Sequence, residues 1–475
     1  MTRTLLFFIC LLCHLSPTLA QQDELPGFGD GNVTSLSQEY YLGRAWLLSF
    51  RRQTPIISDP LIEGYIETLV YKLAETSQLK DRRLDIVVVN NKSINAFAVP
   101  GGVVGVHNGL IMKAETEAQL ASVLAHELAH LSQRHFSRGV ASQQATSKVG
   151  MAGLLAGLVM VAAGSGEAGM ATIMGTQAAS MQNQLRYSRL HEQEADRLGI
   201  QNLAAAGLDP SGAAGMFKVM QQDGRRYGSR PPEFLLTHPV TESRIADGRN
   251  RARTYPSKMY EDNPEFQLMR QRVELSFIED SAAAVARFRR KRAAGGKHAE
   301  AAQYGLVLAL TSNGEYDEAR ILLKPLREFS PTNMTYALAE VDIDIEEGEL
   351  DAAIERLQRG LKLVPNNHPI TMALAKAYYE LKRFHDADVL LTKHSRNKPK
   401  DPNLWYVLAE VQGLAGNTLG LHRSRAEYFA YTGSLQQAMQ QLNYALPLAT
   451  DEITKERINN RSNFFRQVAA ALGQL

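Results

Sequence analysis

The chain has 475 residues, of which 44% are hydrophobic, and its 52 Lys and Arg residues nearly balance 50 Asp and Glu residues. This length predicts two or three domains, each with an apolar core of its own. The net charge of only +2 excludes a strongly basic protein and argues against nucleic acid as a partner.

Residues 1–20 have the composition of a cleaved secretory signal peptide. Arg3 precedes an apolar run over residues 5–15, and the small residues that follow end at Ala20, after which we expect cleavage. The apolar run is too short to span a membrane. Both cysteines of the chain, Cys10 and Cys13, lie inside this segment, so we expect a mature protein without a disulfide or a thiolate zinc site. An exported chain without cysteines suits a bacterial periplasm.

The segment after the signal peptide predicts two helices and a small sheet. Apolar residues recur at helical spacing over residues 37–52 and 60–74, and β-branched residues predict a strand over 84–89. Two more strands, 96–99 and 103–106, are expected around the turn Pro100-Gly101-Gly102. One of the two is a candidate edge for adding a peptide through main-chain hydrogen bonds, and an ordinary hairpin over the core is the alternative. The residues assigned to that edge are Ala96, Phe97, Ala98 and Val99.

The most informative motif is His126-Glu127-Leu128-Ala129-His130, in a run whose apolar residues recur at helical steps. The run predicts a buried helix on which His126 and His130 lie one turn apart, with both imidazoles pointing the same way. Two such nitrogens can hold one tetrahedral Zn²⁺ ion and leave room for a third ligand and a water molecule. Glu127 can take a proton from that water. A chance match is the weaker interpretation, because imidazole and carboxylate groups are costly to bury without a partner.

The third ligand must come from later in the chain. His135 follows His130 by five residues and is expected to face another side of the helix. The metzincin class is excluded, because Gln133 and Phe136 stand where its pattern requires Gly and His.

A second predicted helix begins at His191, and by spacing alone His191, Glu192 and Glu194 are all candidate ligands. Glu192 and Asp196 lie one turn apart on one face of it. A second carboxylate near the metal can hold a ligand imidazole in its correct tautomer. A solvated acidic face is the alternative.

Residues 149–166 form an uncharged, glycine-rich run that is long enough to span a membrane. A single span would put His126 and a ligand near residue 192 on opposite sides of the membrane, and residues 172–183 are too polar for a second crossing. We therefore expect an apolar flap near the site that touches substrate or a membrane surface.

His238 precedes a proline, so we expect its backbone to be extended, with Pro239 starting the helix that bears Arg244. Such a histidine can stabilise the tetrahedral intermediate or occupy a fourth position on the metal. A structural histidine is the alternative.

The His126–His130 motif, Glu192-x-x-Ala195-Asp196 and Thr237-His238-Pro239, behind a signal peptide, together resemble the HtpX- and CAAX-protease-like zinc metallopeptidases. The resemblance covers roughly residues 35–255 and includes the family's strand segment at residues 95–102. It implies that Glu192 is the third zinc ligand, in place of His191 and Glu194, and that Asp196 matches the family's Asp. Because no convincing span is present, the chain is expected to belong to the exported branch of the family.

The second half of the chain repeats itself. The sequence 314–319 recurs at 348–353 and 382–387, in steps of 34 residues, and Pro331, Pro365 and Pro399 keep the same interval. This is the period of tetratricopeptide repeats, whose helix pairs bury each other's apolar faces. Gly433 begins a similar sequence that is offset by half a repeat, which predicts an extra or distorted helix near the C-terminal cap. The Arg-rich helical residues 264–295 predict a solvated face, with an acidic partner as the alternative.

These features predict an α+β fold, in which a mainly helical zincin-type domain with a small sheet precedes an all-α repeat solenoid. The expected divisions are a signal peptide (1–20), a metallopeptidase domain (21–255), a helical linker (256–295) and the tetratricopeptide-repeat domain (296–475).

The resemblance, combined with export and repeats, implies a zinc endopeptidase of a Gram-negative periplasm that degrades misfolded or stalled outer-membrane β-barrel proteins and supports their assembly, with chaperone-like activity. It implies unfolded outer-membrane proteins as partners and, through the repeats, the barrel-assembly machinery, with peripheral membrane contact. The alternative is a non-catalytic periplasmic chaperone or assembly adaptor with a structural zinc ion. Glu127 argues against that alternative, because a structural site has no use for a general base.

Overall fold

The computed structural model describes residues 35–142, 181–226, 233–256 and 258–472. The signal peptide predicted over 1–20 and the flap predicted over 149–166 lie outside the described residues. The described part of the chain is mainly helical and contains one three-stranded sheet, which confirms the predicted fold class. Among the described helices, none is both long enough and apolar enough to cross a membrane.

The N-terminal half is built around the helix that carries the His-Glu-x-x-His motif. Its elements in chain order are α1 (Leu36–Gln53), α2 (Pro60–Thr76), β1 (Asp85–Val89), β2 (Ala96–Val99), β3 (Val103–His107), α3 (Asn108–Lys113), α4 (Glu117–Ser132), α5 (His135–Ser142), α8 (Met181–Ala205), α9 (Gly212–Arg226), α10 (Glu233–Thr237) and α11 (Glu242–Ala252).

The sheet has the order β1-β3-β2, with β1 parallel to β3 and β2 antiparallel to it. Within the described residues β2 therefore lies at an edge of the sheet. The predicted turn joins β2 to β3, and Gly101 and Gly102 take φ angles of +85° and +82° there. Glycine reaches this left-handed region without the steric cost that a side chain would bring.

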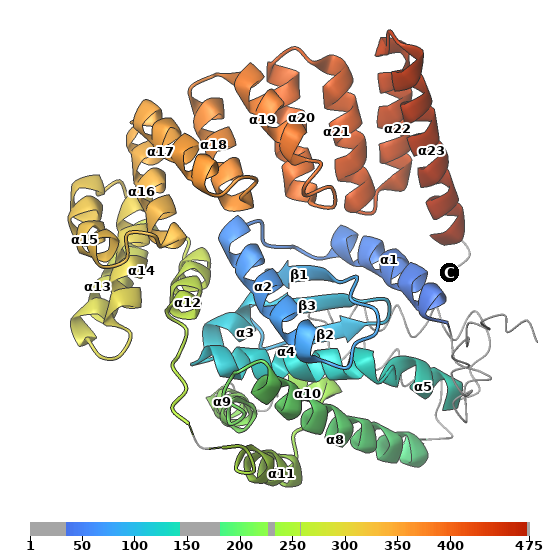
Figure 1. Cartoon of the computed structure of the whole chain (residues 1–475), viewed down its shortest axis with the longest axis vertical. Coiled ribbons are helices and arrows are strands. Elements are labelled where there is room, and N and C mark those ends of the chain that lie inside the picture. Colours follow the sequence, from blue (N-terminus) through green and yellow to red (C-terminus); the bar gives the residue numbers. More distant parts are fainter. Residues whose placement is uncertain (1–34, 143–180, 227–232, 257, 473–475) are drawn as a thin grey trace, which may run out of the picture.

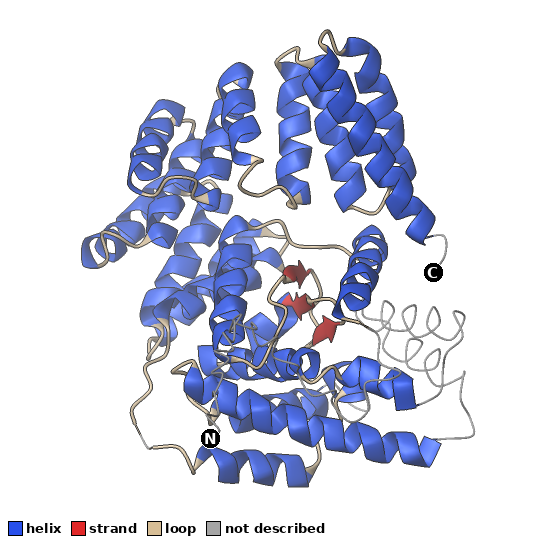
Figure 2. Ribbon diagram, turned by 45° about the vertical axis from the view of Figure 1, so that its right-hand side comes forward, coloured by secondary structure: helices blue, strands red, loops and turns tan. Residues whose placement is uncertain are grey.

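Helices cover both faces of the sheet, and Figure 2 shows the strands enclosed between them. Successive strand residues point to opposite faces. Val87 joins Trp46 and Phe50 of α1 in one apolar core, whereas its neighbour Val88 joins Leu124 of α4 in the other. The sheet is thus held between α1 on one side and α2 and α4 on the other.

The C-terminal half consists of helix pairs that curve over the N-terminal half (Figure 1, yellow to red). Its helices are α12 (Pro264–Ser276), α13 (Ser281–Ala294), α14 (Ala299–Ser312), α15 (Tyr316–Phe329), α16 (Met334–Glu347), α17 (Leu350–Leu363), α18 (His368–Glu380), α19 (Phe384–His394), α20 (Pro402–Leu414), α21 (Thr418–Tyr431), α22 (Leu435–Ala445) and α23 (Glu452–Leu472).

The extra helix predicted near the C-terminal cap is present as a short 3-10 helix, η2 (Leu446–Leu448), which follows α22, but the repeat register does not shift at Gly433. The 34-residue step continues to Gly416, whose φ of +76° repeats the left-handed turns at Gly348 (+92°) and Lys382 (+58°). Gly433 lies one step after Pro399 and turns the chain from α21 to α22. The repeat register is therefore kept, and the apparent offset arises because glycine replaces proline at the turn between repeats.

Two predicted helix starts differ from the structure. The helix expected to begin at His191 is already helical at Met181, the first residue that the structure describes there. The helix expected to begin at Pro239 begins at Glu242, because the side chain of Thr241 accepts a hydrogen bond from the backbone N–H of Arg244 and caps it. Residues 264–295 are helical as expected, and they form two helices, α12 and α13.

The C-terminal half contacts the N-terminal half through a shared apolar core, through ion pairs and through a close backbone approach. The ion pairs are Lys398–Glu67 (2.7 Å), Lys400–Asp85 (3.0 Å) and Arg272–Asp59 (2.8 Å). Gly433 packs so closely on α1 that a Cβ atom there would lie 2.2 Å from the backbone oxygen of Leu48.

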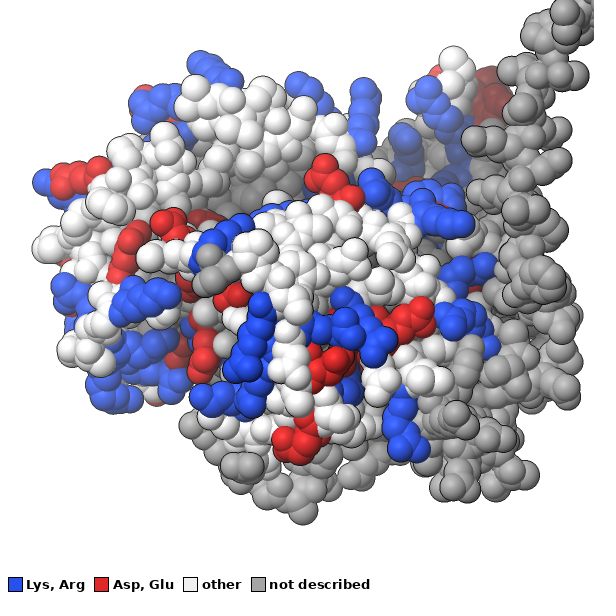
Figure 3. All heavy atoms as spheres, turned by 60° about the horizontal axis from the view of Figure 1, so that its bottom comes forward, with Lys and Arg blue, Asp and Glu red and all other residues white. Residues whose placement is uncertain are grey.

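Acidic and basic side chains are interspersed on the face that carries α8 and α11, as Figure 3 shows. This arrangement agrees with the balanced composition of the chain. Paired charges also account for part of the Arg-rich stretch, since Arg287 and Lys291 both bind Glu274, at 2.6 Å each.

Candidate active site

The histidines of the motif lie on α4, whose N-terminus is capped by the side chain of Thr116. His126 and His130 are one turn apart, and their Nε2 atoms approach to 3.0 Å. His126 is only 5% exposed. The helix therefore presents two imidazole nitrogens to one point, as the sequence predicts.

Glu192 reaches the same point from α8. Its Oε2 atom lies 3.4 Å from His126 Nε2, and its Oε1 atom lies 3.4 Å from His130 Nε2. Gly199 lets α8 pack closely on α4, because a Cβ atom there would already lie 3.2 Å from the backbone nitrogen of His126. The glycine thus helps to bring the carboxylate within reach of both imidazoles.

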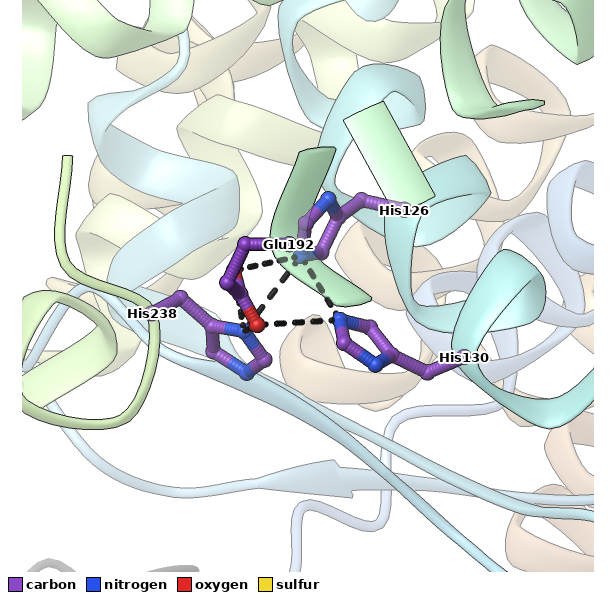
Figure 4. Close-up of side chains that lie close together, drawn as sticks. All are labelled: His126, His130, Glu192 and His238. Atoms are coloured by element: carbon purple, nitrogen blue, oxygen red, sulfur yellow. Dashed lines mark hydrogen bonds and ion pairs between the residues drawn. The ribbon is translucent and has the colours of Figure 1, made fainter. Parts of the chain in front are cut away.

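His238 follows the short helix α10 and completes the group. Its Nδ1 atom lies 3.0 Å from Glu192 Oε1 and 3.3 Å from His126 Nε2, and its ring stacks on Phe234 with 4.6 Å between the ring centres. One ligand atom from each of His126, His130, Glu192 and His238 lies within 4.8 Å of all the others (Figure 4). The four side chains converge on one point from three separate segments.

This group fits a tetrahedral metal ion. Ligand atoms that each lie about 2.0–2.2 Å from Zn²⁺ are separated from one another by roughly 3.3–3.5 Å. Glu192 lies at that spacing from both motif histidines, through Oε2 to His126 Nε2 and through Oε1 to His130 Nε2, at 3.4 Å each, whereas the two Nε2 atoms are closer, at 3.0 Å. Two imidazoles and one carboxylate are also a common ligand set of catalytic zinc.

The charges around the group favour a cation. Burial raises the pKa of Glu192, but His238, His126 and His130 outweigh burial and hold it well below its usual range. Burial lowers the pKa of His126, yet the carboxylates of Asp196 and Glu192 prevail and raise it to about 10. For His130 burial prevails and lowers the pKa to about 3. The site therefore keeps ionised carboxylates in a buried place.

Asp196 lies one turn after Glu192, and its Oδ1 atom is 3.0 Å from His126 Nδ1. A carboxylate there holds the proton on Nδ1 and leaves Nε2 free to bind a metal. The structure thus brings Asp196 to the position in which the sequence expects it to act.

The sequence analysis missed the role of Arg244, which it treated only as a helical residue. Its Nε and Nη2 atoms donate to Asp196 at 2.6 and 2.7 Å, and its Nη1 atom lies 3.1 Å from Glu192 Oε2 and donates to Pro239 O at 2.7 Å. The sequence alone does not indicate that Arg244 is buried while Arg249, on the same helix, is exposed.

Glu127 is 2% exposed, and its Oε1 atom has no hydrogen-bond partner within the described part of the chain. His238 Nε2 lies 3.6 Å from that atom. Burial raises the pKa of Glu127, and His238 and His126 offset this only in part. A buried carboxylate with an unused oxygen and a raised pKa is suited to accept a proton at neutral pH.

The other histidine and carboxylate candidates, His135, His191 and Glu194, lie beside the converging group. His135 Nδ1 lies 2.9 Å from Nδ1 of His130, and its Nε2 atom lies 3.0 Å from Glu194 Oε2. His191 stacks on His135 with 4.1 Å between the ring centres. Of the three ligands that spacing left open, only Glu192 belongs to the converging group.

A cavity of about 220 Å³ lies next to the group. It is lined by Glu127, His130 and His238 and by the predicted edge residues Ala96, Phe97, Ala98 and Val99. The edge strand and the candidate base therefore face the same space.

Both halves of the chain have known relatives. A family model described as Peptidase family M48 matches residues 60–252, and a tetratricopeptide-repeat model matches residues 344–411. The chain is 35% identical over 436 residues to the "Beta-barrel assembly-enhancing protease" of Escherichia coli (strain K12), which covers 91% of this chain and 89% of that protein.

Two further relatives align over similar lengths. The "Putative beta-barrel assembly-enhancing protease" of Vibrio cholerae is 36% identical over 445 residues, covering 92% of this chain and 91% of that protein. The "Beta-barrel assembly-enhancing protease" of Yersinia pestis is 36% identical over 434 residues, covering 90% and 88%. These matches extend across the predicted peptidase and repeat regions together.

Proposed function

The chain belongs to peptidase family M48 and is a metallopeptidase, and from this we propose that it is a zinc endopeptidase of the Gram-negative periplasm. Its proposed substrates are misfolded or stalled outer-membrane β-barrel proteins, whose assembly it supports with chaperone-like activity. The observation that carries the proposal is the convergence of His126, His130 and Glu192 beside the buried Glu127.

The metal is proposed to be one zinc ion per chain, held by His126, His130 and Glu192. When bound, it would supply Lewis acidity, which lowers the pKa of a water molecule and polarises the scissile carbonyl. Asp196 holds His126 through Nδ1, and Arg244 holds Asp196 and Glu192 in turn. These contacts keep the ligands oriented before any metal binds.

Glu127 is the proposed general base. It takes the proton of the attacking water on its unpartnered Oε1 atom and later delivers that proton to the leaving amine. The peptide is proposed to pair with the edge strand β2 through main-chain hydrogen bonds, which would hold it extended beside Glu127.

His238 has two candidate roles, which its position supports equally. It stabilises the oxyanion of the tetrahedral intermediate, or it occupies the water's place on the metal as a latch. The variant His238→Ala tests both roles. If it leaves both proteolysis and zinc occupancy unchanged, neither role holds.

The repeats are proposed to bind protein segments of unfolded outer-membrane proteins and of the barrel-assembly machinery. Repeat solenoids present extended concave surfaces for such segments. The names of the relatives and the match to a repeat model support this assignment, and the periplasmic location follows from the same relatives together with the predicted signal peptide.

The test is the variant Glu127→Gln, which keeps the size of the side chain and removes the base. We expect unchanged zinc content and melting temperature, but loss of at least about 10²-fold in cleavage of an unfolded β-barrel protein. The exposed Glu75 of α2 provides a control, because Glu75→Gln should cleave as the wild type does. Cleavage by Glu127→Gln at the wild-type rate would refute Glu127 as the general base, and absence of cleavage by the wild type would favour the adaptor alternative.

A further inference from the structure

The cavity beside the candidate site extends away from Glu127 as far as α1. Its far part is lined by Val99 and Pro100 on the strand side and by Leu131 and Phe136 on the helical side. Glu39 of α1 lines it there too. Residue 39 lies outside residues 60–252, the range that the family model matches.

Glu39 is only 6% exposed, and its negative charge is paired. The Nε and Nη2 atoms of Arg134 donate to Glu39 Oε1 at 3.0 and 2.7 Å, and the hydroxyl of Ser137 donates to the same oxygen. The carboxylate and the guanidinium therefore cancel each other at the α1 end of the cavity.

The backbone is shaped to make this pair. Arg134 follows Gln133, the C-cap of α4, and takes a left-handed φ of +53°, a conformation that is strained for a residue with a side chain. Such conformations persist where the surrounding structure fixes them, often at functional sites. On the other side, a Cβ atom on Gly101 would lie 2.2 Å from the backbone oxygen of Glu39, so the β2–β3 turn packs directly on α1.

We infer that this part of the cavity is a specificity pocket that takes an apolar side chain of the substrate next to the scissile bond, and that the Glu39–Arg134 pair makes it neutral. This inference rests on the proposed peptidase function. The pocket adjoins Glu127 and the edge strand, so a peptide paired with β2 places a side chain in it.

The lining decides the class of side chain. Val99, Pro100, Leu131 and Phe136 give an apolar side chain surface to bury, at roughly 25 cal/mol for each Å² removed from water. An acidic side chain would be repelled by Glu39, and a basic side chain would be repelled by Arg134. Neither would find a free partner, because Glu39 and Arg134 already bind each other. A charged side chain would therefore lose its hydration without gaining a partner.

The inference predicts reciprocal changes when one member of the pair loses its charge. Glu39→Gln keeps the side-chain shape and exposes the charge of Arg134, whereas Arg134→Met exposes the charge of Glu39. Glu39→Gln should raise kcat/KM for an acidic residue relative to leucine by about tenfold, and Arg134→Met should do the same for lysine. The double variant should return to the apolar preference of the wild type.

The experiment uses the zinc-loaded full-length protein. Cleavage sites in an unfolded β-barrel protein are mapped first by mass spectrometry. Peptides that span one such site then carry Leu, Phe, Gln, Glu or Lys at each of the two positions on either side of the cleaved bond. Glu427→Gln serves as a control, because Glu427 is bound by Arg461 at 2.5 Å in a partly buried pair that lies on the repeats.

The outcomes separate this inference from the proposed function. Wild-type cleavage with an apolar preference at one position, followed by opposite shifts in the two single variants at that position, supports the pocket. An unchanged ranking in both variants overturns the pocket and leaves the peptidase function standing. Absence of cleavage by the wild type overturns the proposed function itself. If Glu39→Gln lowers the melting temperature too far for assay, the lysine preference of Arg134→Met decides alone.

Discussion

Replacing Arg244 with methionine should lower the free energy of unfolding of the peptidase domain and weaken its affinity for the metal. Arg244 is 5% exposed and makes two hydrogen bonds to Asp196, one to Pro239 O and an ion pair with Glu192. Methionine fills much of the same space but provides no donor. The variant therefore removes a buried cation from two buried carboxylates.

The expected cost follows from that burial. Breaking a buried charge pair by removing one partner costs about 3–5 kcal/mol, because the other charge stays buried without compensation. Arg251 offers a comparison on the same helix. It pairs with Asp247 at 2.8 Å, but both side chains are more than a third exposed, so Arg251→Met should cost less than about 1 kcal/mol. Loss of the residue that orients the ligands should also weaken metal binding by about 10–100-fold.

The assay is urea unfolding of the metal-free protein, followed by the fluorescence of Trp46. The chain contains two tryptophans, and Trp405→Phe removes the one on the repeats, so that the remaining signal reports on the core between α1 and the sheet. Zinc affinity is then measured by competition with a chelating dye. The reasoning is refuted if Arg244→Met and Arg251→Met lose the same stability, or if Arg244→Met binds zinc as tightly as the wild type.

Three further predictions concern the metal, the repeat interface and pH. Removing metal with a chelator should abolish cleavage and lower the melting temperature of the peptidase domain, and adding Zn²⁺ should restore both; an unchanged melting temperature would contradict a metal held by three protein ligands. Gly433→Ala should lower the melting temperature, because the new Cβ atom would lie 2.2 Å from Leu48 O and because the φ of +84° favours glycine. Gly295→Ala is the control: the space around its Cβ atom is open, so this variant should lose only the stability that backbone strain costs. Burial and the nearby Asp401 and Asp59 raise the pKa of Glu63 to about 8, so the stability that its protonated form contributes below pH 4.5 is lost as the pH rises through 8. Glu63→Gln should therefore stabilise the protein by about 2–4 kcal/mol at pH 8.5 and little at pH 5, and a pH-independent difference would refute the shift.

Sequence reasoning succeeded where the determinants are local. The β2–β3 hairpin depends on two glycines that take left-handed φ angles, and both stand in the motif itself. The motif helix depends on apolar spacing and on the cap at Thr116. The repeats depend on a period that can be counted along the chain.

It was less successful where distant segments meet. Spacing could not choose among His191, Glu192 and Glu194, because the choice depends on how α8 packs on α4, and only the family resemblance pointed to Glu192. Arg244 and Glu39 were not assigned roles for the same reason, since their partners lie 48 and 95 residues away. The observed start of α11 differs from the predicted one because Thr241, and not Pro239, determines where the helix begins by providing the cap.

One helix links the candidate pocket to the repeats. The first turns of α1 carry Glu39, which lines the cavity, and its last turns meet the repeats through Leu48 and through Arg51, which donates to Tyr431 O at 3.5 Å. The Lys398–Glu67 pair instead joins the repeats to α2, which does not line the cavity. Because a helix moves largely as a unit, loosening the Gly433 contact should disturb the choice of substrate residue, whereas loosening the Lys398 contact should spare it. Comparing Gly433→Ala with Lys398→Met in the peptide series would show which contact matters for cleavage.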